Sequence, residues 1–291
     1  MFRGAGVAIV TPFKNDTVDL EAYGKLMDFQ MDNGIQCMVT LGTTGEASVL
    51  TEEERNQVIT LTVEKCKDRI PVMVGVGSNN TAAAKKYAQT AEILGADGVL
   101  LVTPYYNKCT QKGLVEHFKA VAEAVSVPVI AYNVPGRTGV NIEPATVAQL
   151  SAIGNVVGIK EASGNLSQIL EIKRLVPDDF MIWSGNDDNI LPIYSVGGHG
   201  VISVMGNMIP AETQAICQHF MEGRLSEAID LQLKTKKLFN LLFCEVNPIP
   251  IKAALAMMGM IENELRLPLT SMEEGKAAEL KQEMVNLGIL S

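Results

Sequence analysis

The stretch VIAYNVPGRTGVNIEPATVAQLSAIGNVVGIKE at residues 129–161 decides the fold class, because it contains a complete strand–helix–strand unit. The runs Val129–Tyr132 and Val156–Lys160 are apolar nearly throughout, which is typical of parallel strands covered on both faces. Between them, Pro144 suits the first turn of a helix, where its missing N–H is not needed. The unit predicts parallel strands that are joined by helices.

The same alternation covers most of the chain. Thr51–Glu54 matches a capping box, and Asn80 opens an Ala-rich helix. Eight βα units in about 220 residues favour a closed (β/α)8 TIM barrel over an open doubly wound sheet. The open sheet would also normally carry a G-x-G-x-x-G fingerprint, which this sequence lacks. The predicted strands are Gly6–Val10, Cys37–Leu41, Val72–Val76, Val99–Val102, Val129–Tyr132, Val156–Lys160, Met181–Ser184 and Val201–Val204.

The strand pattern stops near Arg224. Beyond it, the periodicity predicts three helices, near residues 225–240, 249–259 and 272–287. We therefore predict a catalytic α/β barrel at residues 1–224 and a C-terminal helical appendage at residues 225–291. The appendage is expected to pack against the barrel or against another subunit.

The composition narrows the class of function. The 291 residues include 24 Lys plus Arg and 33 Asp plus Glu, a formal charge of −9, which disfavours nucleic acid and anionic membranes as partners. Five scattered cysteines without a C-x-x-C pair and three histidines predict no metal site and indicate a reducing compartment. The first residues lack a signal-peptide pattern and no run is long enough to span a bilayer, so we expect a cytoplasmic protein.

Lys160 is the sharpest candidate for chemistry. Active sites of (β/α)8 barrels lie at the carboxyl ends of the strands, and Lys160 ends an otherwise apolar strand. Burial there should lower the pKa of its ammonium group and supply a free amine that attacks a carbonyl. From the pattern alone, an ion pair between Lys160 and Glu161 is an equally good interpretation.

Two further positions on the same rim are suited to carboxylates. Thr43 and Thr44 lie in a glycine-flanked turn, where backbone N–H groups and two hydroxyls can hold a small carboxylate. The alternative is ordinary turn chemistry, in which Gly and Thr are common. Arg137 follows the strand ending at Tyr132 and could bind a second carboxylate, or could be a surface arginine.

Tyr132 and Tyr106 each end a strand, where a phenol next to an imine could relay protons. Packing tyrosines with a solvated tip are the alternative. Gly185, at the end of another strand, could present a backbone carbonyl without a side chain in the way, or could only permit a tight turn.

Taken together, these residues resemble the dihydrodipicolinate synthase (4-hydroxy-tetrahydrodipicolinate synthase) family of class I pyruvate-dependent aldolases and lyases. The resemblance covers the whole chain, and YNVPGRTG with GIKEASGN is its most specific pair of motifs. The matching motifs are GAGVAIVTPF at 4–13, GTTGE at 42–46, TPYYNK at 103–108, YNVPGRTG at 132–139, GIKEASGN at 158–165, GGHGVISV at 197–204 and NPIPIK at 247–252.

The resemblance implies that pyruvate forms a Schiff base on Lys160 and condenses, as an enamine, with L-aspartate 4-semialdehyde. Transimination by the substrate amine would then close the ring and release Lys160, in the diaminopimelate route to lysine. No metal or organic cofactor would be needed, since the imine itself is the electron sink. By the same resemblance the catalytic residues are Lys160, Tyr132, Thr44 and Tyr106, and the substrate-binding residues are Thr43, Thr44, Arg137, Gly185 and Ile202.

The resemblance also implies an oligomer. The residue that matches Tyr106 reaches into the site of a neighbouring subunit in this family. A dimer would therefore be the minimum active unit, and a homotetramer built as a dimer of dimers would be the usual state.

An effector cleft is implied at Ser48, Arg55, Asn79 and Tyr105. Family members that lysine inhibits carry a histidine and a glutamate in this cleft, whereas the matching positions here hold Arg55 and Ala83. We therefore predict weak or absent feedback inhibition by lysine.

Two other functions compete with this interpretation. An N-acetylneuraminate lyase or a 2-keto-3-deoxy sugar acid aldolase would share the lysine, but Arg137 and the tyrosine pair at 105–106 favour a short carboxylated aldehyde over a long polyol. A barrel-fold binding or regulatory protein without turnover would require a broken site, and no member of the catalytic set is missing.

Overall fold

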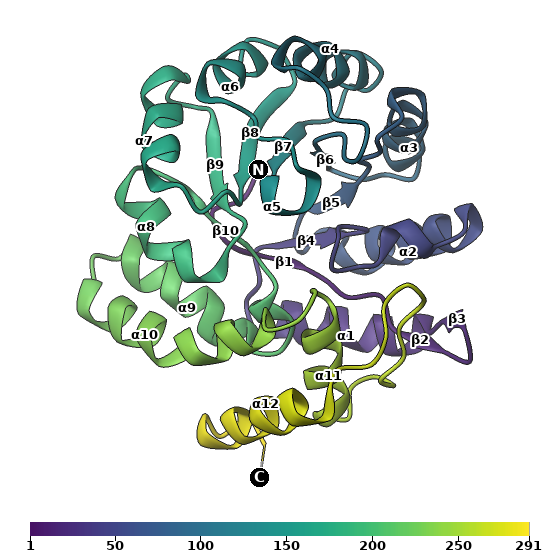
Figure 1. Ribbon diagram of the computed structural model, residues 1–291, viewed down its shortest axis with the longest axis vertical. Coiled ribbons are helices and arrows are strands. Elements are labelled where there is room, and N and C mark those ends of the chain that lie inside the picture. The colour runs from purple at the N-terminus through teal and green to yellow at the C-terminus, as the bar shows by residue number, and fades with distance from the viewer. Residues whose placement is uncertain (291) are drawn as a thin grey trace.

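The computed structural model describes residues 1–290, which form an eight-stranded parallel barrel (Figure 1). The first strand pairs with the second and with the last barrel strand, so the sheet closes and the open doubly wound alternative is wrong. All eight predicted strands are present, with ends shifted by up to two residues. They are β1 (Gly4–Ala8), β4 (Cys37–Thr40), β5 (Val72–Gly75), β6 (Gly98–Val102), β7 (Val129–Asn133), β8 (Val156–Glu161), β9 (Met181–Ser184) and β10 (Gly200–Ser203).

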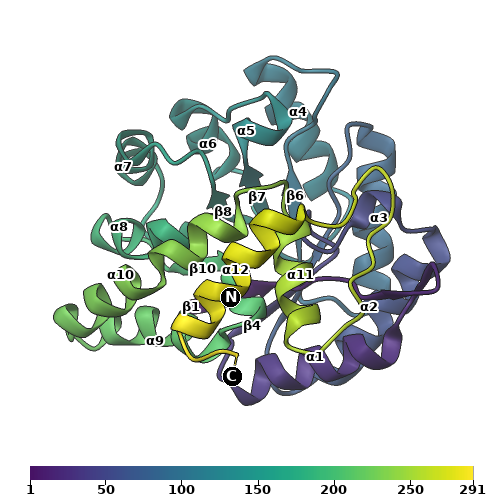
Figure 2. The ribbon, with the colours of Figure 1, turned by 60° about the horizontal axis from the view of Figure 1, so that its bottom comes forward.

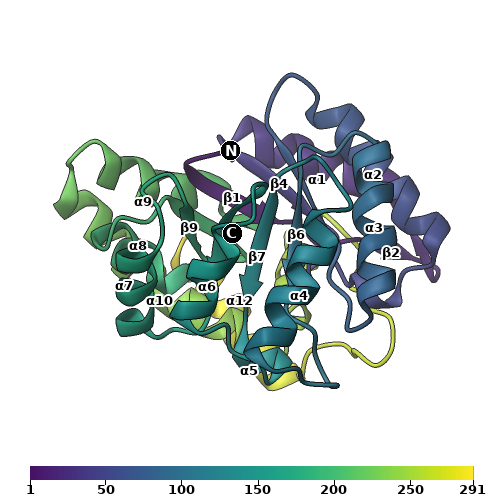
Figure 3. The same ribbon diagram turned by 90° about the horizontal axis from the view of Figure 1, so that it is seen from above.

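Helices follow the strands and surround the barrel (Figure 1), and Figure 3 shows the same arrangement from the side. The predicted capping box at Thr51 is formed, and the Asn80 side chain accepts from the backbone N–H groups of Ala82 and Ala83. A small hairpin of β2 (Phe13–Lys14) and β3 (Thr17–Val18) precedes the first helix. The surrounding helices are α1 (Leu20–Asp32), α2 (Glu52–Cys66), α3 (Thr81–Ile93), α4 (Gln111–Ala122), α6 (Pro144–Leu150), α7 (Leu166–Leu175), α8 (Ile190–Ser195) and α9 (Pro210–Met221).

The three predicted C-terminal helices are confirmed as α10 (Leu225–Leu242), α11 (Ile249–Met257) and α12 (Glu274–Asn286). Figure 2 shows α12 beside α10 and α11. Leu242, Leu255 and Met284 belong to the same apolar cluster as the barrel helices, so these helices share the main core. A division of the chain at residue 224 stays a prediction.

A second apolar cluster fills the barrel interior. It includes Trp183 of β9 and Ile202 of β10, and Phe2 stacks on Trp183 with ring centroids 5.1 Å apart. Because Phe2 precedes β1, this packing closes the amino-terminal end of the barrel. No helix within residues 1–290 is both long enough and apolar enough to cross a membrane.

Candidate active site

Lys160 lies inside the barrel, on β8. Strand residues alternate between the two faces, and Lys160 pairs in register with Tyr132 of β7, whose ring also faces inward. The lysine Nζ lies 4.4 Å from the centroid of the Tyr132 ring, and only 5% of Lys160 is exposed. An amine and a phenol are therefore buried side by side.

Glu161 faces the opposite side of β8. Its Oε2 accepts from Asn133 Nδ2 at 2.9 Å, and its Oε1 accepts from the backbone N–H of Ser163 at 2.6 Å. None of the ion pairs formed within residues 1–290 involves the Lys160 amine. The alternative ion pair between Lys160 and Glu161 is thus not formed.

Burial sets the protonation of both groups. It lowers the pKa of Lys160 to about 8, against an opposing effect of Asp187 and with a small contribution from Arg137. Burial also raises the pKa of Tyr132 to about 12, which Arg137 and Thr43 partly oppose. Near neutral pH the site therefore offers a partly deprotonated amine beside a phenol that keeps its proton.

Thr43 and Thr44 belong to a turn at residues 42–46 that follows β4. Gly45 N–H donates to the Gly42 carbonyl and Glu46 N–H donates to the Thr43 carbonyl, each at 3.1 Å. Thr44 is buried and its Oγ1 accepts from Asn247 Nδ2 at 2.9 Å, whereas Thr43 is exposed to the cavity. The turn thus holds the Thr44 hydroxyl in place by a hydrogen bond and leaves the Thr43 side chain accessible from the cavity.

Arg137 lies on α5 (Pro135–Thr138), a single turn after β7. Its guanidinium is exposed and Nη2 donates to the Asn247 carbonyl at 3.3 Å. Gly185, after β9, is required by close packing, because a Cβ there would lie 3.1 Å from Lys160 Cε and 2.6 Å from Ala162 Cβ. A side chain at position 185 would therefore crowd the side chain of Lys160.

Two cavities that share part of their lining lie among these residues. The smaller, of about 50 Å³, is lined by residues that include Lys160, Tyr132, Thr44 and Gly185. The larger, of about 420 Å³, shares Thr43, Tyr132 and Arg137 with it and extends to the predicted cleft residues Ser48, Arg55 and Tyr105.

Three predicted residues line neither cavity. Tyr106 is 91% exposed and its backbone is left-handed, with φ of +69°. Ile202 is fully buried in the barrel interior, and Asn79 is half-buried, with its carbonyl bonded to Asn107 Nδ2. The functions predicted for these three residues stay predictions.

Two residues at the site were missed by sequence reasoning. Asn247 contacts both Thr44 and Arg137, although it is 203 positions from Thr44, and its only signal was its place in the NPIPIK motif. Asp187 is buried near Lys160, and its Oδ2 accepts from the backbone N–H groups of Val204 and Met205. Nothing in the local sequence distinguished Asp187 from a residue at a helix N-terminus.

The arrangement is suited to capture of a carbonyl compound. A buried amine can form an imine, while the neighbouring phenol and hydroxyls can bind and relay protons. Within residues 1–290 there is no group of three or more His, Cys, Asp or Glu side chains that could hold a metal ion.

Known proteins resemble the chain over its full length. A model of the "Dihydrodipicolinate synthetase family" matches residues 1–286. A 4-hydroxy-tetrahydrodipicolinate synthase from Alkaliphilus oremlandii is 61% identical, with 100% of both chains covered. A dihydrodipicolinate synthase structure from Thermotoga maritima has a TM-score of 0.98 at 46% identity, covering 100% of both chains. A chloride-inhibited Acinetobacter baumannii dihydrodipicolinate synthase, solved with pyruvate, has a TM-score of 0.97 at 41% identity, again covering 100% of both chains.

Proposed function

The chain belongs to the dihydrodipicolinate synthetase family and is a lyase of the 4-hydroxy-tetrahydrodipicolinate synthase type, and we propose that it holds pyruvate as an imine on Lys160. The observation that carries this proposal is a buried amine with a lowered pKa, without an ion-pair partner among the carboxylates of residues 1–290, beside Tyr132 and beneath an open cavity. The full-length relatives favour this activity in lysine biosynthesis over the sialic acid and sugar-acid lyases.

The first half of the reaction uses Lys160, Tyr132 and the 42–46 turn. The free amine of Lys160 attacks the C2 carbonyl of pyruvate, and loss of water gives the imine. Tyr132 and Thr44 move the protons that this dehydration requires. The hydroxyls and backbone N–H groups of Thr43 and Thr44 hold the pyruvate carboxylate.

The second half uses Arg137 and the larger cavity. Loss of a methyl proton converts the imine into an enamine, which attacks the aldehyde carbon of L-aspartate 4-semialdehyde. Arg137 holds the carboxylate of this second substrate, since it is the exposed cation shared by both cavities. The substrate amine then displaces Lys160 by transimination and closes the ring.

Tyr106 supplies the third member of the proton relay to a neighbouring subunit. Its support is a phenol that is 91% exposed and carried on a left-handed residue of the loop after β6. A strained backbone that projects an aromatic ring into solvent suits a contact made outside its own chain. A homotetramer made of two such dimers is the proposed assembly.

Borohydride reduction in the presence of pyruvate tests the proposal directly. We expect a single adduct of pyruvate size on the peptide that contains Lys160, because reduction converts the imine into a stable secondary amine. Peptide mapping by mass spectrometry locates it. Protein reduced without pyruvate is the control, and an adduct on a different lysine, or none, would refute the mechanism.

Imine formation should rise with pH and level off above about pH 8. The nucleophile is the free amine, whose share grows as the pH approaches the lowered pKa of Lys160, about 8. At pH 7 roughly one tenth of the amine is free, against well under one thousandth at an ordinary lysine pKa. Single-turnover trapping between about pH 6 and pH 11 measures this. An inflection above about pH 10 would contradict the role of burial.

Lysine should inhibit the enzyme weakly or not at all. Arg55 lines the larger cavity, its guanidinium stacks 4.3 Å from the Tyr87 ring centroid, and none of the lining residues is acidic. A cationic cavity repels the ammonium groups of lysine. A steady-state assay at submillimolar lysine should retain most activity, and near-complete inhibition would contradict the prediction. The matched variant is Arg55→His with Ala83→Glu, which should gain a response.

A further inference from the structure

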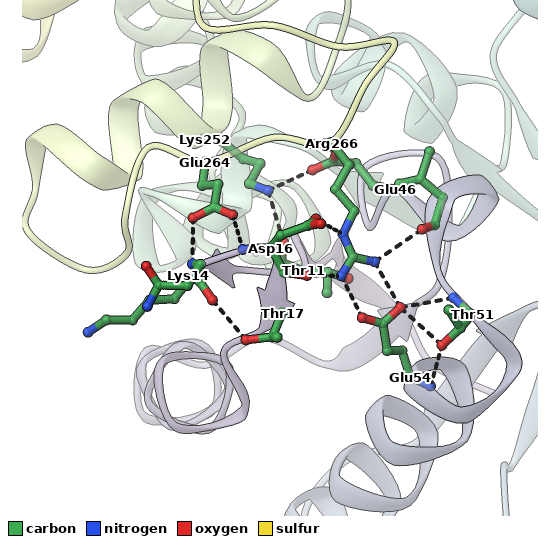
Figure 4. A network of polar contacts seen from close by, with 12 residues as sticks. Thr11, Lys14, Asp16, Thr17, Glu46, Thr51, Glu54, Lys252, Glu264 and Arg266 are labelled. Atoms are coloured by element: carbon green, nitrogen blue, oxygen red, sulfur yellow. Dashed lines mark hydrogen bonds and ion pairs between the residues drawn. The ribbon is translucent and has the colours of Figure 1, made fainter.

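An ion pair without solvent contact anchors the turn at residues 42–46 (Figure 4). Lys252 Nζ lies 2.6 Å from Glu46 Oε1, and the two side chains are 0% and 1% exposed. The same ammonium donates to the Thr11 carbonyl at 3.0 Å. The ammonium group of Lys252 therefore joins three segments that are distant in sequence. They are the loop after β1, which contains Thr11, the turn at residues 42–46, and α11.

The backbone is strained immediately before the turn, at Leu41, and at its last residue, Glu46. Leu41 and Glu46 adopt left-handed conformations, with φ of +53° and +50°. Non-glycine residues in this region carry roughly 1–3 kcal/mol of strain and persist only where the surroundings hold them. The Glu46 carboxylate supplies such a hold, since its second oxygen also accepts from the backbone N–H of Arg266 at 3.3 Å.

The element that carries Lys252 also reaches Thr44. Asn247 precedes Pro248, the N-cap residue of α11, and the backbone N–H of Lys252 donates to the Pro248 carbonyl at 3.0 Å. Asn247 Nδ2 donates to Thr44 Oγ1 at 2.9 Å. Lys252 thus fixes the distal end of the turn through Glu46, while the start of its own helix holds the Thr44 hydroxyl.

Stability alone is a poor explanation for this pair. Burying two charges carries a desolvation penalty, and replacing a buried ion pair by uncharged groups of similar volume is often neutral or stabilising. A short charge-assisted hydrogen bond does provide a directional restraint. On the solvent side of the Lys252–Glu46 pair, Arg266 forms further ion pairs with Glu54 and Asp16 (Figure 4).

We propose that Glu46 and Lys252 are positioning residues for the reaction, because their ion pair sets the orientation of the Thr44 hydroxyl toward the cavity that contains Lys160. The proposal rests on the proton-relay function proposed for Thr44. A hydroxyl that accepts from Asn247 keeps its own proton free to donate into the cavity. Loss of the ion pair would release the turn from this orientation while leaving the amine of Lys160 in place.

A double-mutant cycle between Lys252→Met and Thr44→Val tests the proposal. Lys252→Met should lower kcat by about tenfold to a hundredfold, since a displacement of about 1 Å has this effect. Thr44→Val should lower kcat by about a hundredfold, because it removes the hydroxyl that relays the proton. The double variant should lie within about threefold of the slower single variant, because both changes act on one hydroxyl. All variants are measured at a temperature at which circular dichroism shows them folded.

The double variant Glu46→Gln with Lys252→Met separates an effect on positioning from an effect on stability. It also takes the place of Lys252→Met in the cycle if Lys252→Met alone does not fold. This uncharged pair should unfold at a higher denaturant concentration than Lys252→Met alone, without recovery of kcat. If kcat recovers together with stability in the uncharged pair, the proposal is overturned. It is also overturned if the effects of Lys252→Met and Thr44→Val on kcat multiply in the double variant.

Arg266→Met is the matched control from the same network. The variant keeps the backbone N–H that donates to Glu46 but removes the ion pair with Glu54, so it should lower stability. Its effect on kcat should be independent of Thr44→Val, so that the two effects multiply in the double variant. Coupling of Arg266→Met to Thr44→Val as strong as that of Lys252→Met would overturn the assignment. An unchanged kcat in Thr44→Val would overturn both the positioning function and the relay function of Thr44, while imine trapping on Lys160 would still stand.

Discussion

Replacement of Lys160 by methionine should lower kcat by about four orders of magnitude or more, while the free energy of unfolding stays the same or rises. The variant removes the only amine in the cavity within residues 1–290, so neither imine nor enamine can form. Burial lowers the pKa of Lys160, which means that folding disfavours its charged form. Removing that charge at neutral pH therefore also removes a destabilising contribution. Steady-state kinetics and urea unfolding measure the two effects.

Lys119→Met on α4 is the matched control for this variant. Lys119 is exposed and its charge pairs only loosely with Glu123, at 3.8 Å, so the same chemical change there should leave kcat unaltered. Activity in Lys160→Met above about one hundredth of the parent value would exclude Lys160 as the nucleophile. Loss of activity together with a large loss of stability would instead assign Lys160 a structural function.

The barrel could be predicted because apolar strands and capped helices alternate along the chain, but both ends of the first strand could not. The pattern placed the first strand at Gly6–Val10, whereas β1 spans Gly4–Ala8. The difference arises from pairing of Gly4 with Gly200, where a Cβ on Gly200 would lie 1.9 Å from the Gly4 carbonyl oxygen. Such a close backbone approach favours glycine, which hydrophobic periodicity treats as a break.

The site could be predicted where it depends on neighbouring strands. Lys160 and Tyr132 end consecutive parallel strands, so their proximity follows from the fold. The contacts of Asn247 with Thr44 and of Lys252 with Glu46 could not be predicted, since they depend on which face of a C-terminal helix docks on the barrel. The helical pattern gives a length and an apolar side, but not a partner more than 200 positions away.

Gly75→Ala should cause a large loss of stability. An ideal Cβ at position 75 would lie 2.1 Å from the Leu41 carbonyl oxygen and 2.6 Å from the Leu41 carbonyl carbon. Both are backbone atoms, so no side-chain rotation relieves the overlap, and the end of β4 must move. Overpacking typically lowers the free energy of unfolding by about 1–3 kcal/mol, and an overlap between backbone atoms should fall at the upper end of this range. The displaced segment leads into the 42–46 turn, so kcat should fall by roughly a hundredfold as well.

Gly275→Ala provides the matched control, because nothing lies within 4 Å of a Cβ built on Gly275 in α12. The same methyl group should there raise stability slightly, by about 0.4–1 kcal/mol, through a smaller unfolded-state entropy. Urea unfolding and kcat are measured for both variants. A Gly75→Ala protein with the parent's stability would show that β4 and β5 separate without strain. A stable protein with low kcat would instead mean that the movement is absorbed by the turn, which lies between the left-handed Leu41 and the left-handed Glu46 that ends it.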